Sequence, residues 1–325
     1  MSVAVPRWAV AILAAGKGTR MRSERPKVLH ELAGRPMLDH VIDLALAVAR
    51  PHDVVVVVGH GVAEVTELVR DRGLSEVVQE PQLGTGDALR IALRGLDARP
   101  TECVVVLSGD VPLLRAATVR RLLDELDAGA AAALLTAELA EPAAYGRVVR
   151  GADGSVAEIV EAGDAAADLL AIREVNAGTY VFNRSALVDA LGTLGQNNVQ
   201  GEYYLTDVVA SLTSRGLRVS AVRLADPTEM QGVNSRADLA AAERVLNRRI
   251  LDTLMASGVT IRDPGTTWVD PRAEVGPDAV LEPGVVLRGS CRIGAGARIG
   301  ANSVLDHAAV GAGEVVRPLT FLTGE

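Results

Sequence analysis

The residues best suited to chemistry lie in a glycine-rich, basic loop near the N-terminus. Gly16-Lys17-Gly18-Thr19-Arg20-Met21 is followed by Arg25-Pro26-Lys27, so five cations and one acidic residue lie between positions 17 and 27. Small residues let a backbone approach a nucleotide closely, and ammonium and guanidinium groups neutralise phosphate charge. The loop therefore predicts a polyphosphate site. The alternative is a glycine turn with solvated charges.

Neither of the two best-known phosphate motifs describes this loop. A Walker A sequence would need Gly at position 11, where this chain has Ala11. The dinucleotide fingerprint would need Gly or Ala at position 21, where this chain has Met21. A phosphate site in this loop would therefore belong to neither of these two classes.

A second glycine loop lies further along the chain, at Gln82-Leu83-Gly84-Thr85-Gly86-Asp87-Ala88. It precedes a segment predicted to be helical, with Leu89 and Leu93 on one face. Backbone N–H groups at the start of a helix have no partner within the helix, so they can contact a base or a phosphate. By itself the Gly-Thr-Gly sequence is weak support for such a site.

Oxygen ligands for a metal ion are available at two further positions. Asp110 follows the aliphatic run 104–107, just past the predicted end of a buried strand. A carboxylate in that place suits Mg²⁺, although the residue could instead cap the following helix. A second ligand must come from elsewhere, and Asn234 in the segment 232–236 offers one.

The elements that position these residues read as an α/β fold. Through about residue 230 the chain alternates strands, loops and helices, which is typical of a mostly parallel sheet covered by helices. The runs 54–58 and 104–107 are continuously aliphatic, as in strands buried on both faces. Apolar residues recur at helical spacing in 37–48 and 65–69. We predict a doubly wound, Rossmann-like α/β domain over residues 1–235.

Between positions 145 and 183 the pattern changes to short β segments with polar turns, at 147–149, 156–160 and 179–182. We expect these three segments to form an antiparallel insertion over the main sheet. Such an insertion commonly forms half of a substrate pocket. A long helix is then predicted from residue 236 to about 256, as a connector ending at residue 257.

The last part of the chain, residues 258–325, has a strict period of six. The repeated positions are Val269, Val275, Leu281, Leu287, Ile293, Ile299 and Leu305. Neither a strand nor an α-helix produces this period, whereas a left-handed parallel β-helix does, with three hexads to each triangular turn. The register slips by one near 307–309 and resumes at Val310, which predicts a loop or a defective coil there.

Composition excludes several classes of protein. The 325 residues carry a net charge of −8 and only 2% aromatics, which argues against a nucleic-acid partner. Cys103 and Cys291 lie in no metal or disulfide pattern, so we expect a reducing compartment, the cytoplasm. Residues 7–15 loosely resemble a signal peptide, but a buried first strand fits better. No apolar run reaches the roughly 20 residues needed to span a membrane, so no membrane partner is predicted.

Taken together, the motifs resemble those of the sugar-nucleotide pyrophosphorylases. The match extends through residues 8–260 and into the repeats. It is most specific in the segment Asn197-Asn198-Val199-Gln200-Gly201-Glu202-Tyr203-Tyr204-Leu205-Thr206-Asp207. That segment, followed by hexapeptide repeats, resembles the bacterial bifunctional branch that joins an N-acetylglucosamine-1-phosphate uridylyltransferase to a glucosamine-1-phosphate acetyltransferase. The implied reaction is Mg²⁺-dependent uridylyl transfer from UTP to N-acetylglucosamine 1-phosphate, for cell-envelope precursor synthesis.

The resemblance also implies the role of each matched residue. The uridine would be held by Leu13, Ala14, Ala15, Gly16, Gln79, Gly84 and Thr85, and Gln82 would be a further substrate-binding residue. The triphosphate would be neutralised by the catalytic residues Arg20 and Lys27, and Mg²⁺ would be bound by Asp110 and Asn234. The nucleotide pocket would be lined by Ser108 and Gly109. The sugar would be held by Gly146, Glu161 and Asn176, with Tyr204 and Thr206 nearby.

The chain departs from the family pattern at several points. Asp87 stands where the family usually has His and is expected to weaken UTP binding slightly, and Ser235 stands where the family often has Asn. The repeats are shorter than those that carry the acetyltransferase site, and their one histidine, His307, is predicted to lie on the surface. Acetyl transfer is therefore predicted absent. The β-helix is expected to support a homotrimer.

Two other functions remain open from the sequence. One is nucleotidyl transfer to another sugar 1-phosphate, such as glucose 1-phosphate with dTTP or UTP. The other is a non-catalytic sugar-nucleotide sensor or assembly scaffold, against which the joint presence of Lys27, Asp110 and Asn234 argues. Pyrophosphate release with different nucleotide and sugar pairs distinguishes the enzymes from one another and from a binding protein.

Overall fold

The computed structural model describes residues 8–59, 63–97 and 101–324 and divides into two compact units. The first unit comprises Met1–His30 and Met37–Ser235, and the second comprises Glu31–Pro36 and Arg236–Glu325. Positions 31–36, predicted as part of the first domain, group with the second unit in the structure. They form a small hairpin of β2 (Glu31–Leu32) and β3 (Arg35–Pro36).

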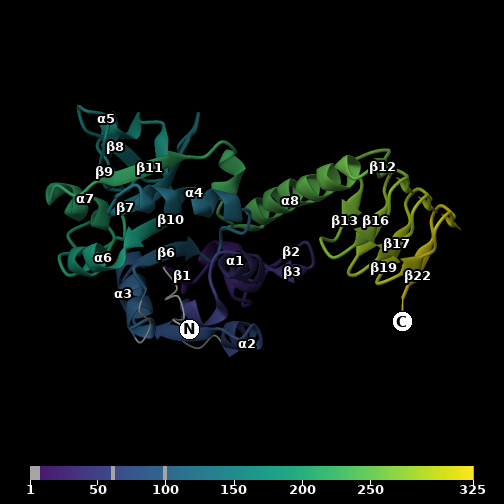
Figure 1. Ribbon diagram of the computed structural model, residues 1–325, viewed down its shortest axis with the longest axis horizontal. Coiled ribbons are helices and arrows are strands. Elements are labelled where there is room, and N and C mark those ends of the chain that lie inside the picture. The colour runs from purple at the N-terminus through teal and green to yellow at the C-terminus, as the bar shows by residue number, and fades with distance from the viewer. Residues whose placement is uncertain (1–7, 60–62, 98–100, 325) are drawn as a thin grey trace, which may run out of the picture. The chain divides into compact units, whose positions relative to one another are not determined.

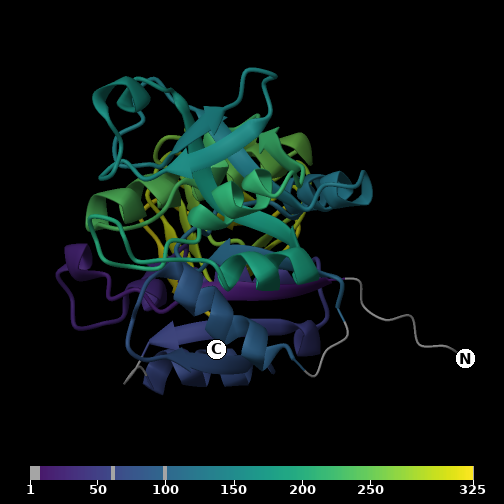
Figure 2. The same ribbon diagram turned by 90° about the vertical axis from the view of Figure 1, so that its left-hand side faces the viewer.

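A single large sheet organises the first unit (Figure 1). In spatial order its main strands are β11 (Val219–Arg223), β7 (Ala132–Glu138), β10 (Glu174–Asn183), β6 (Cys103–Ser108), β1 (Trp8–Ala14), β4 (Val54–Gly59) and β5 (Ser75–Gln79). Strand β1, the purple strand that crosses the unit in Figure 2, runs parallel to both β4 and β6. The carboxyl ends of these three strands therefore lie at one edge of the sheet, where open α/β sheets bind ligands.

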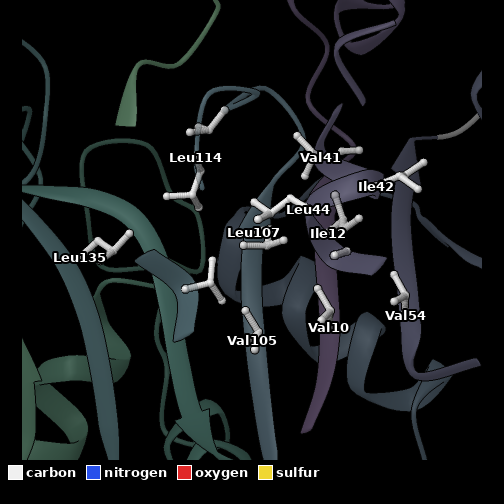
Figure 3. Close-up of a cluster of buried hydrophobic side chains, with 14 of the residues drawn as sticks. Val10, Ile12, Val41, Ile42, Leu44, Val54, Val105, Leu107, Leu114 and Leu135 are labelled. Atoms are coloured by element: carbon white, nitrogen blue, oxygen red, sulfur yellow. The ribbon is translucent and has the colours of Figure 1, made fainter. Parts of the chain in front are cut away.

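Helices cover both faces of this sheet. One face packs against α1 (Met37–Leu46), α2 (Ala63–Asp71) and α4 (Ala116–Asp127). The other packs against α3 (Thr85–Gly95), α6 (Arg184–Leu191) and α7 (Asp207–Ser214). Val10 and Ile12 of β1 point into the first core (Figure 3), and Ala9 and Ala11 point into the second. Because both faces are covered, the strands are continuously apolar, and the predicted doubly wound α/β class is confirmed.

The prediction of a three-stranded antiparallel insertion is wrong for residues 179–182. They belong to β10, which pairs antiparallel with β6 and β7 inside the main sheet. Val181 faces one core, and Tyr180 and Phe182 face the other, as a central strand requires. Only β8 (Arg147–Arg150) and β9 (Val156–Val160) form a separate hairpin, joined to the sheet through the pairing of β8 with β10.

Shorter elements complete the first unit. They are the 3₁₀ helices η1 (Thr19–Met21), η2 (Lys27–Leu29), η3 (Pro51–Asp53) and η4 (Pro227–Met230), and the short helix α5 (Ala167–Leu170). In the part of the chain that the structure describes, no helix has the length and hydropathy needed to cross a membrane.

The second unit consists of the β2–β3 hairpin, the long helix α8 (Arg236–Ala256) and a left-handed parallel β-helix. One face of the β-helix holds β12 (Thr260–Ile261), β15 (Val280–Leu281), β18 (Arg298–Ile299) and β21 (Val315–Val316). The second holds β13 (Trp268–Val269), β16 (Val286–Arg288), β19 (Val304–Asp306) and β22 (Phe321–Thr323). The third holds β14 (Glu274–Val275), β17 (Arg292–Ile293) and β20 (Ala309–Val310). The repeated aliphatic residues pack together inside, which confirms the interpretation of the six-residue period.

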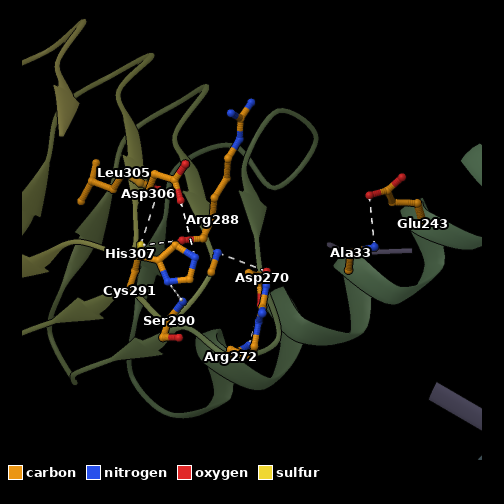
Figure 4. A network of polar contacts seen from close by, with 11 residues as sticks. Ala33, Glu243, Asp270, Arg272, Arg288, Ser290, Cys291, Leu305, Asp306 and His307 are labelled. Carbon is orange, nitrogen blue, oxygen red and sulfur yellow. Dashed lines mark hydrogen bonds and ion pairs between the residues drawn. The ribbon is translucent and has the colours of Figure 1, made fainter. Parts of the chain in front are cut away.

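The predicted register slip is a coil that is shorter by one residue. The paired residues Leu287 and Leu305 lie 18 positions apart, whereas Leu305 and Leu322 lie 17 apart. His307 stands at the shortened corner with a φ of 50°. Its ring covers Gly289 and its Nδ1 accepts a 3.4 Å hydrogen bond from the N–H of Ser290 (Figure 4). The side chain is 56% exposed, so the predicted surface position is confirmed.

Helix α8 closes the first coil of the β-helix with polar as well as apolar contacts. Leu251 joins the interior of the β-helix. Asn247, which is buried, donates to the carbonyl of Thr267 at 2.8 Å and accepts from the N–H of Val269 at 3.1 Å. These bonds satisfy backbone groups of the first coil that have no preceding coil to pair with. The hairpin joins the same helix where the N–H of Ala33 donates to Glu243 at 3.3 Å.

The interior of the β-helix allows a stability prediction. Leu287 is 2% exposed and lies between Val269 and Leu305 of the neighbouring coils. Leu287→Ala should lower the free energy of unfolding of the second unit by about 3 kcal/mol, through lost burial and a residual cavity. Urea denaturation followed by circular dichroism measures this loss. The control Arg288→Ala, at the exposed neighbouring position of the same strand, should cost little, and equal losses in both variants would contradict the predicted interior.

Candidate functional site

The candidate site lies at the carboxyl ends of β1, β5 and β6 in the first unit. The N–H of Gly109 donates to the carbonyl of Leu13 at 2.9 Å and so joins the ends of β6 and β1. A Cβ on Gly109 would stand 3.0 Å from the Cβ of Ala14, so a larger residue would push these ends apart. Beside them is a pocket of about 510 Å³. Its lining includes Ala14, Ala15, Gly16, Lys17, Lys27, Gln79 and Gln82.

The first glycine loop turns back and returns Lys27 to the strand ends. Gly18 has a φ of 61°, and a Cβ there would lie 2.4 Å from the Cβ of Lys27. Glycine is therefore required for both the conformation and the close approach. Val28 and Leu29 of η2 are buried in the core and anchor the returning chain. Lys27 is thereby fixed, with a side chain only 10% exposed.

Three residues far apart in the sequence meet at this point. Lys27 Nζ donates to Asp110 Oδ2 in an ion pair and to Asn234 Oδ1 at 3.1 Å. The N–H of Val233 donates to the carbonyl of Asp110 at 2.9 Å, which brings the segment before α8 to the end of β6. The residue before α4 is Arg115, so Asp110 does not cap that helix. Arg20, by contrast, is exposed, and within the described ranges no ion pair involves it.

The Asp110 and Asn234 oxygens fit a hard cation. Both already converge on one positive charge, that of Lys27. Carboxylate and amide oxygens are ligands that Mg²⁺ prefers, and Mg²⁺ commonly takes only one or two protein ligands and completes its shell with phosphates and water. Among the described residues there is no cluster of three His, Cys, Asp or Glu that would make a cage formed by protein ligands alone. The donor set therefore suits a metal shared with a phosphorylated substrate.

The second glycine loop is held against the segment 202–205. Gly84 has a φ of 105° and precedes α3, and a Cβ on it would lie 2.6 Å from the carbonyl oxygen of Tyr203. The N–H of Gly86 donates to that same carbonyl at 2.8 Å, and the N–H of Leu205 donates to Thr85 Oγ1 at 3.1 Å. The segment that carried the most specific part of the resemblance thus holds this loop in place.

Two glutamines join the second loop to the first. The Gln82 side-chain amide donates to the carbonyl of Ala15. The Gln79 amide nitrogen donates to the carbonyl of Gly84 and to the carboxylate of Asp87, both at 3.0 Å. Gln79 is only 3% exposed. Both glutamines line the pocket, so their positions are fixed by the loops on either side of it.

The residues predicted to hold a sugar form a second group in the same unit. Thr206 Oγ1 donates to Glu161 Oε1 at 3.0 Å. The N–H of Asn176 donates to the carbonyl of Gly146 at 2.9 Å, and a Cβ on Gly146 would stand 3.4 Å from Glu161 Oε2. Absence of a side chain at position 146 therefore leaves the Glu161 carboxylate accessible.

This group is tied to the end of β6. Asn176 Oδ1 accepts from the N–H of Gly178 at 3.0 Å, and Ser108 Oγ lies 3.4 Å from the carbonyl of Gly178. Asn176 Nδ2 donates to Tyr180 Oη at 2.6 Å. Neither Tyr180 nor Tyr203 is among the site residues predicted from the sequence. Tyr180 lies four residues after Asn176 on β10, and the signal that could have found it is the alternation of faces along a strand.

The group is acidic, and burial shifts its pKa values. Burial raises the pKa of Glu161, and the nearby carboxylates of Asp164 and Asp207 add to the rise, while the Thr206 hydroxyl opposes it. Burial also raises the pKa of Tyr204 to about 12, helped by Asp164. A site rich in carboxylates suits the neutral hydroxyls of a sugar better than another phosphate.

We therefore expect the Glu161 side chain to lower the stability of the folded protein at neutral pH while it contributes to sugar binding. Because its pKa is raised in the folded protein, the stabilisation it gives is present below the ordinary carboxyl pKa and is lost as pH rises through the raised value. At neutral pH the ionised side chain costs stability. We expect Glu161→Gln to raise the melting temperature at pH 7.5, with little effect near pH 4, and to raise the KM for a sugar 1-phosphate about tenfold. The control is Glu158→Gln, at an exposed acid of β9, the strand that ends just before Glu161. An unchanged sugar KM in Glu161→Gln would contradict the assignment.

Comparisons with known proteins agree with both parts of the chain. Residues 10–210 match the family described as the MobA-like NTP transferase domain, and residues 272–307 match the bacterial transferase hexapeptide (six repeats). The chain is 46% identical over 314 residues to the bifunctional protein GlmU of Thermobifida fusca, which covers 95% of the chain and 65% of that protein. It is 47% identical over 316 residues to GlmU of Kineococcus radiotolerans, covering 96% and 64% of the two lengths. For GlmU of Burkholderia thailandensis the identity is 46% over 315 residues, covering 97% and 69%. The chain thus spans about two thirds of the length of these relatives.

Proposed function

Since this chain belongs to the GlmU family of nucleotidyltransferases with hexapeptide repeats, we propose that it transfers a uridylyl group from UTP to N-acetylglucosamine 1-phosphate. The products are UDP-N-acetylglucosamine and pyrophosphate. The observation that carries the proposal is the convergence of Lys27, Asp110 and Asn234 at the carboxyl ends of β1 and β6. A protein that only binds a sugar nucleotide does not need an ammonium group and two potential metal ligands at one point.

The pocket beside these residues holds the nucleotide. Its walls are the strand end and first loop on one side and the second loop on the other. The residues proposed to contact the uridine are Leu13, Ala14, Ala15, Gly16, Gln79, Gln82, Gly84 and Thr85. The phosphates then extend toward Lys27, with Arg20 available from the exposed side of the first loop.

The acidic group holds the sugar. Glu161, Thr206 and Asn176 offer hydrogen bonds to hydroxyl and amide groups, and Gly146 leaves room above the carboxylate. Tyr204 lies near Glu161 in the same group. Ser108 and Gly109 at the end of β6 lie between this group and the nucleotide pocket.

The reaction needs no protein nucleophile. A phosphate oxygen of the sugar 1-phosphate attacks the α-phosphorus of UTP in line, the bond to the bridging oxygen breaks, and pyrophosphate leaves with the electron pair. The work of the protein is to hold two polyanions together and to neutralise their charge, which Lys27 and Arg20 do. Asp110 and Asn234 would hold a bound Mg²⁺, which would add to the charge neutralisation on the phosphates.

The test is pyrophosphate release with defined pairs of substrates. UTP with N-acetylglucosamine 1-phosphate should give the highest kcat/KM, above UTP or dTTP with glucose 1-phosphate. A higher value for a glucose 1-phosphate pair would reassign the substrate within the same reaction class. Calorimetric binding of UDP-N-acetylglucosamine without any turnover would instead identify a sensor or scaffold.

We also propose that the β-helix mediates a homotrimer. The hexapeptide match supports an assembly, and so do the exposed apolar side chains of Val315, Leu319 and Phe321, which are 68%, 79% and 66% exposed. Sedimentation equilibrium should give three times the mass of the chain. A monomer at micromolar concentration would refute this part of the proposal without affecting the reaction.

A further inference from the structure

Asp87 contacts a pocket residue rather than solvent alone. It lies in the first turn of α3, at a position where the resemblance predicts His. Its carboxylate accepts a 3.0 Å hydrogen bond from the side-chain nitrogen of Gln79, the last residue of β5. The same nitrogen donates to the carbonyl of Gly84 at 3.0 Å.

These two contacts fix which end of the Gln79 carboxamide faces the loop. A carbonyl and a carboxylate can only accept hydrogen bonds, so the atom near both must be the NH₂ group. Turning the amide over would place its oxygen against two acceptors. The Gln79 oxygen Oε1 therefore points away from Gly84 and Asp87. No hydrogen bond to this oxygen occurs among the residues that the structure describes.

The Oε1 atom therefore gives the pocket an acceptor of fixed position. Gln79 lines the same pocket as Ala14 and Ala15, which are proposed to contact the uridine. Uracil carries a donor, N3–H, where cytosine carries an acceptor, N3. A fixed acceptor pairs with the first and repels the second.

We propose that Asp87 is a positioning residue that makes the pocket select uracil over cytosine, by holding Gln79 with its oxygen toward the base. This inference rests on the proposed function, because it assumes that a pyrimidine nucleotide occupies the pocket. Gly84 alone would hold the amide less firmly, since a hydrogen bond to a neutral carbonyl is weaker than one to a carboxylate.

The preference for UTP over CTP can be measured independently of any repulsion between the Asp87 carboxylate and the phosphates. UTP and CTP carry the same triphosphate, so any repulsion between Asp87 and the phosphates weakens both equally. The ratio of their dissociation constants depends only on how the base is recognised. That ratio therefore reports the orientation of Gln79 and is unaffected by a general loss of affinity.

The experiment measures binding of UTP and CTP in the presence of Mg²⁺ by calorimetry. The wild-type chain should bind UTP at least tenfold more tightly, and Asp87→Leu, which offers no acceptor, should reduce this preference about tenfold. Asp87→Asn should give an intermediate preference because its amide oxygen can still accept. The matched control is Asp97→Asn, an exposed acid just beyond the other end of α3 that pairs with Arg184, and it should keep the wild-type preference.

The outcomes separate this inference from the proposed function. An unchanged preference in Asp87→Leu, or a wild-type chain without preference, overturns the role of Asp87. A preference that responds to Asp87→Leu, in a chain that releases no pyrophosphate with N-acetylglucosamine 1-phosphate, supports the role of Asp87 and refutes the uridylyl transfer. Absence of binding to either nucleotide overturns both. Melting curves of every variant identify a loss of fold, and Asp87→Asn provides the test should Asp87→Leu unfold.

Discussion

Lys27→Ala should lower kcat for pyrophosphate release by about 1,000-fold. Its ammonium group is the positive charge held at the junction of the two strand ends, with a side chain only 10% exposed. Burial of that kind strengthens the interaction with a phosphate, because little water competes for the charge. The charge that develops on the departing pyrophosphate would then lose the fixed ammonium group beside it.

The size of this effect depends on position rather than on charge alone. Lys27→Arg should rescue little, because a planar guanidinium cannot replace a compact ammonium group between Asp110 and Asn234. Arg22→Gln removes an exposed cation of the same loop and should change kcat by less than about twofold. Near-normal turnover in Lys27→Ala, in a variant with a wild-type melting curve, would refute the proposed catalytic role of Lys27.

Sequence patterns predicted the parts of the structure that depend on local periodicity. The aliphatic run at 54–58 became β4, and the six-residue period became the coils of the β-helix, with a one-residue deletion near His307. These parts could be predicted because the spacing of apolar residues along one element reflects which of its faces are buried. The hairpin at 31–36 shows the limit, since its grouping with α8 depends on contacts across 200 residues of sequence.

Strand β10 shows a second limit. Its residues 179–182 alternate between two cores, but a short apolar stretch near polar turns is typical of an insertion as well as of a central strand. Only the pairing with β6 and β7 distinguishes the two, and pairing is a property of the whole sheet.

The candidate site divides in the same way. Lys27, Asp110 and Asn234 could each be selected for residue type and place in the sequence, but their meeting at one point could not be derived from it. The resemblance supplied that grouping as an expectation. Residues that act by supporting others, such as Tyr203 beneath the second loop, carry no chemical signal in the sequence because their contribution is made through the backbone.

Asp110→Ala is expected to lower kcat/KM by about 1,000-fold and to remove the dependence on Mg²⁺ concentration that we expect of the wild type. The variant should still fold, because the backbone carbonyl of residue 110 that accepts from Val233 is unchanged. Asp110→Asn keeps the shape but loses the charge, so its residual activity should need several times more Mg²⁺. Titrating pyrophosphate release against Mg²⁺ measures both effects.

The pairing with Lys27 makes a stronger test. If the two residues act as a unit on the same phosphate, Lys27→Ala combined with Asp110→Ala should cost little more than either change alone. Two independent contributions would multiply, and the double variant would then lose about a million-fold. Because the ammonium and the carboxylate already form an ion pair, we expect the first result. Multiplying losses would mean that the two groups serve different steps, and unaltered turnover in Asp110→Ala would exclude it as a metal ligand.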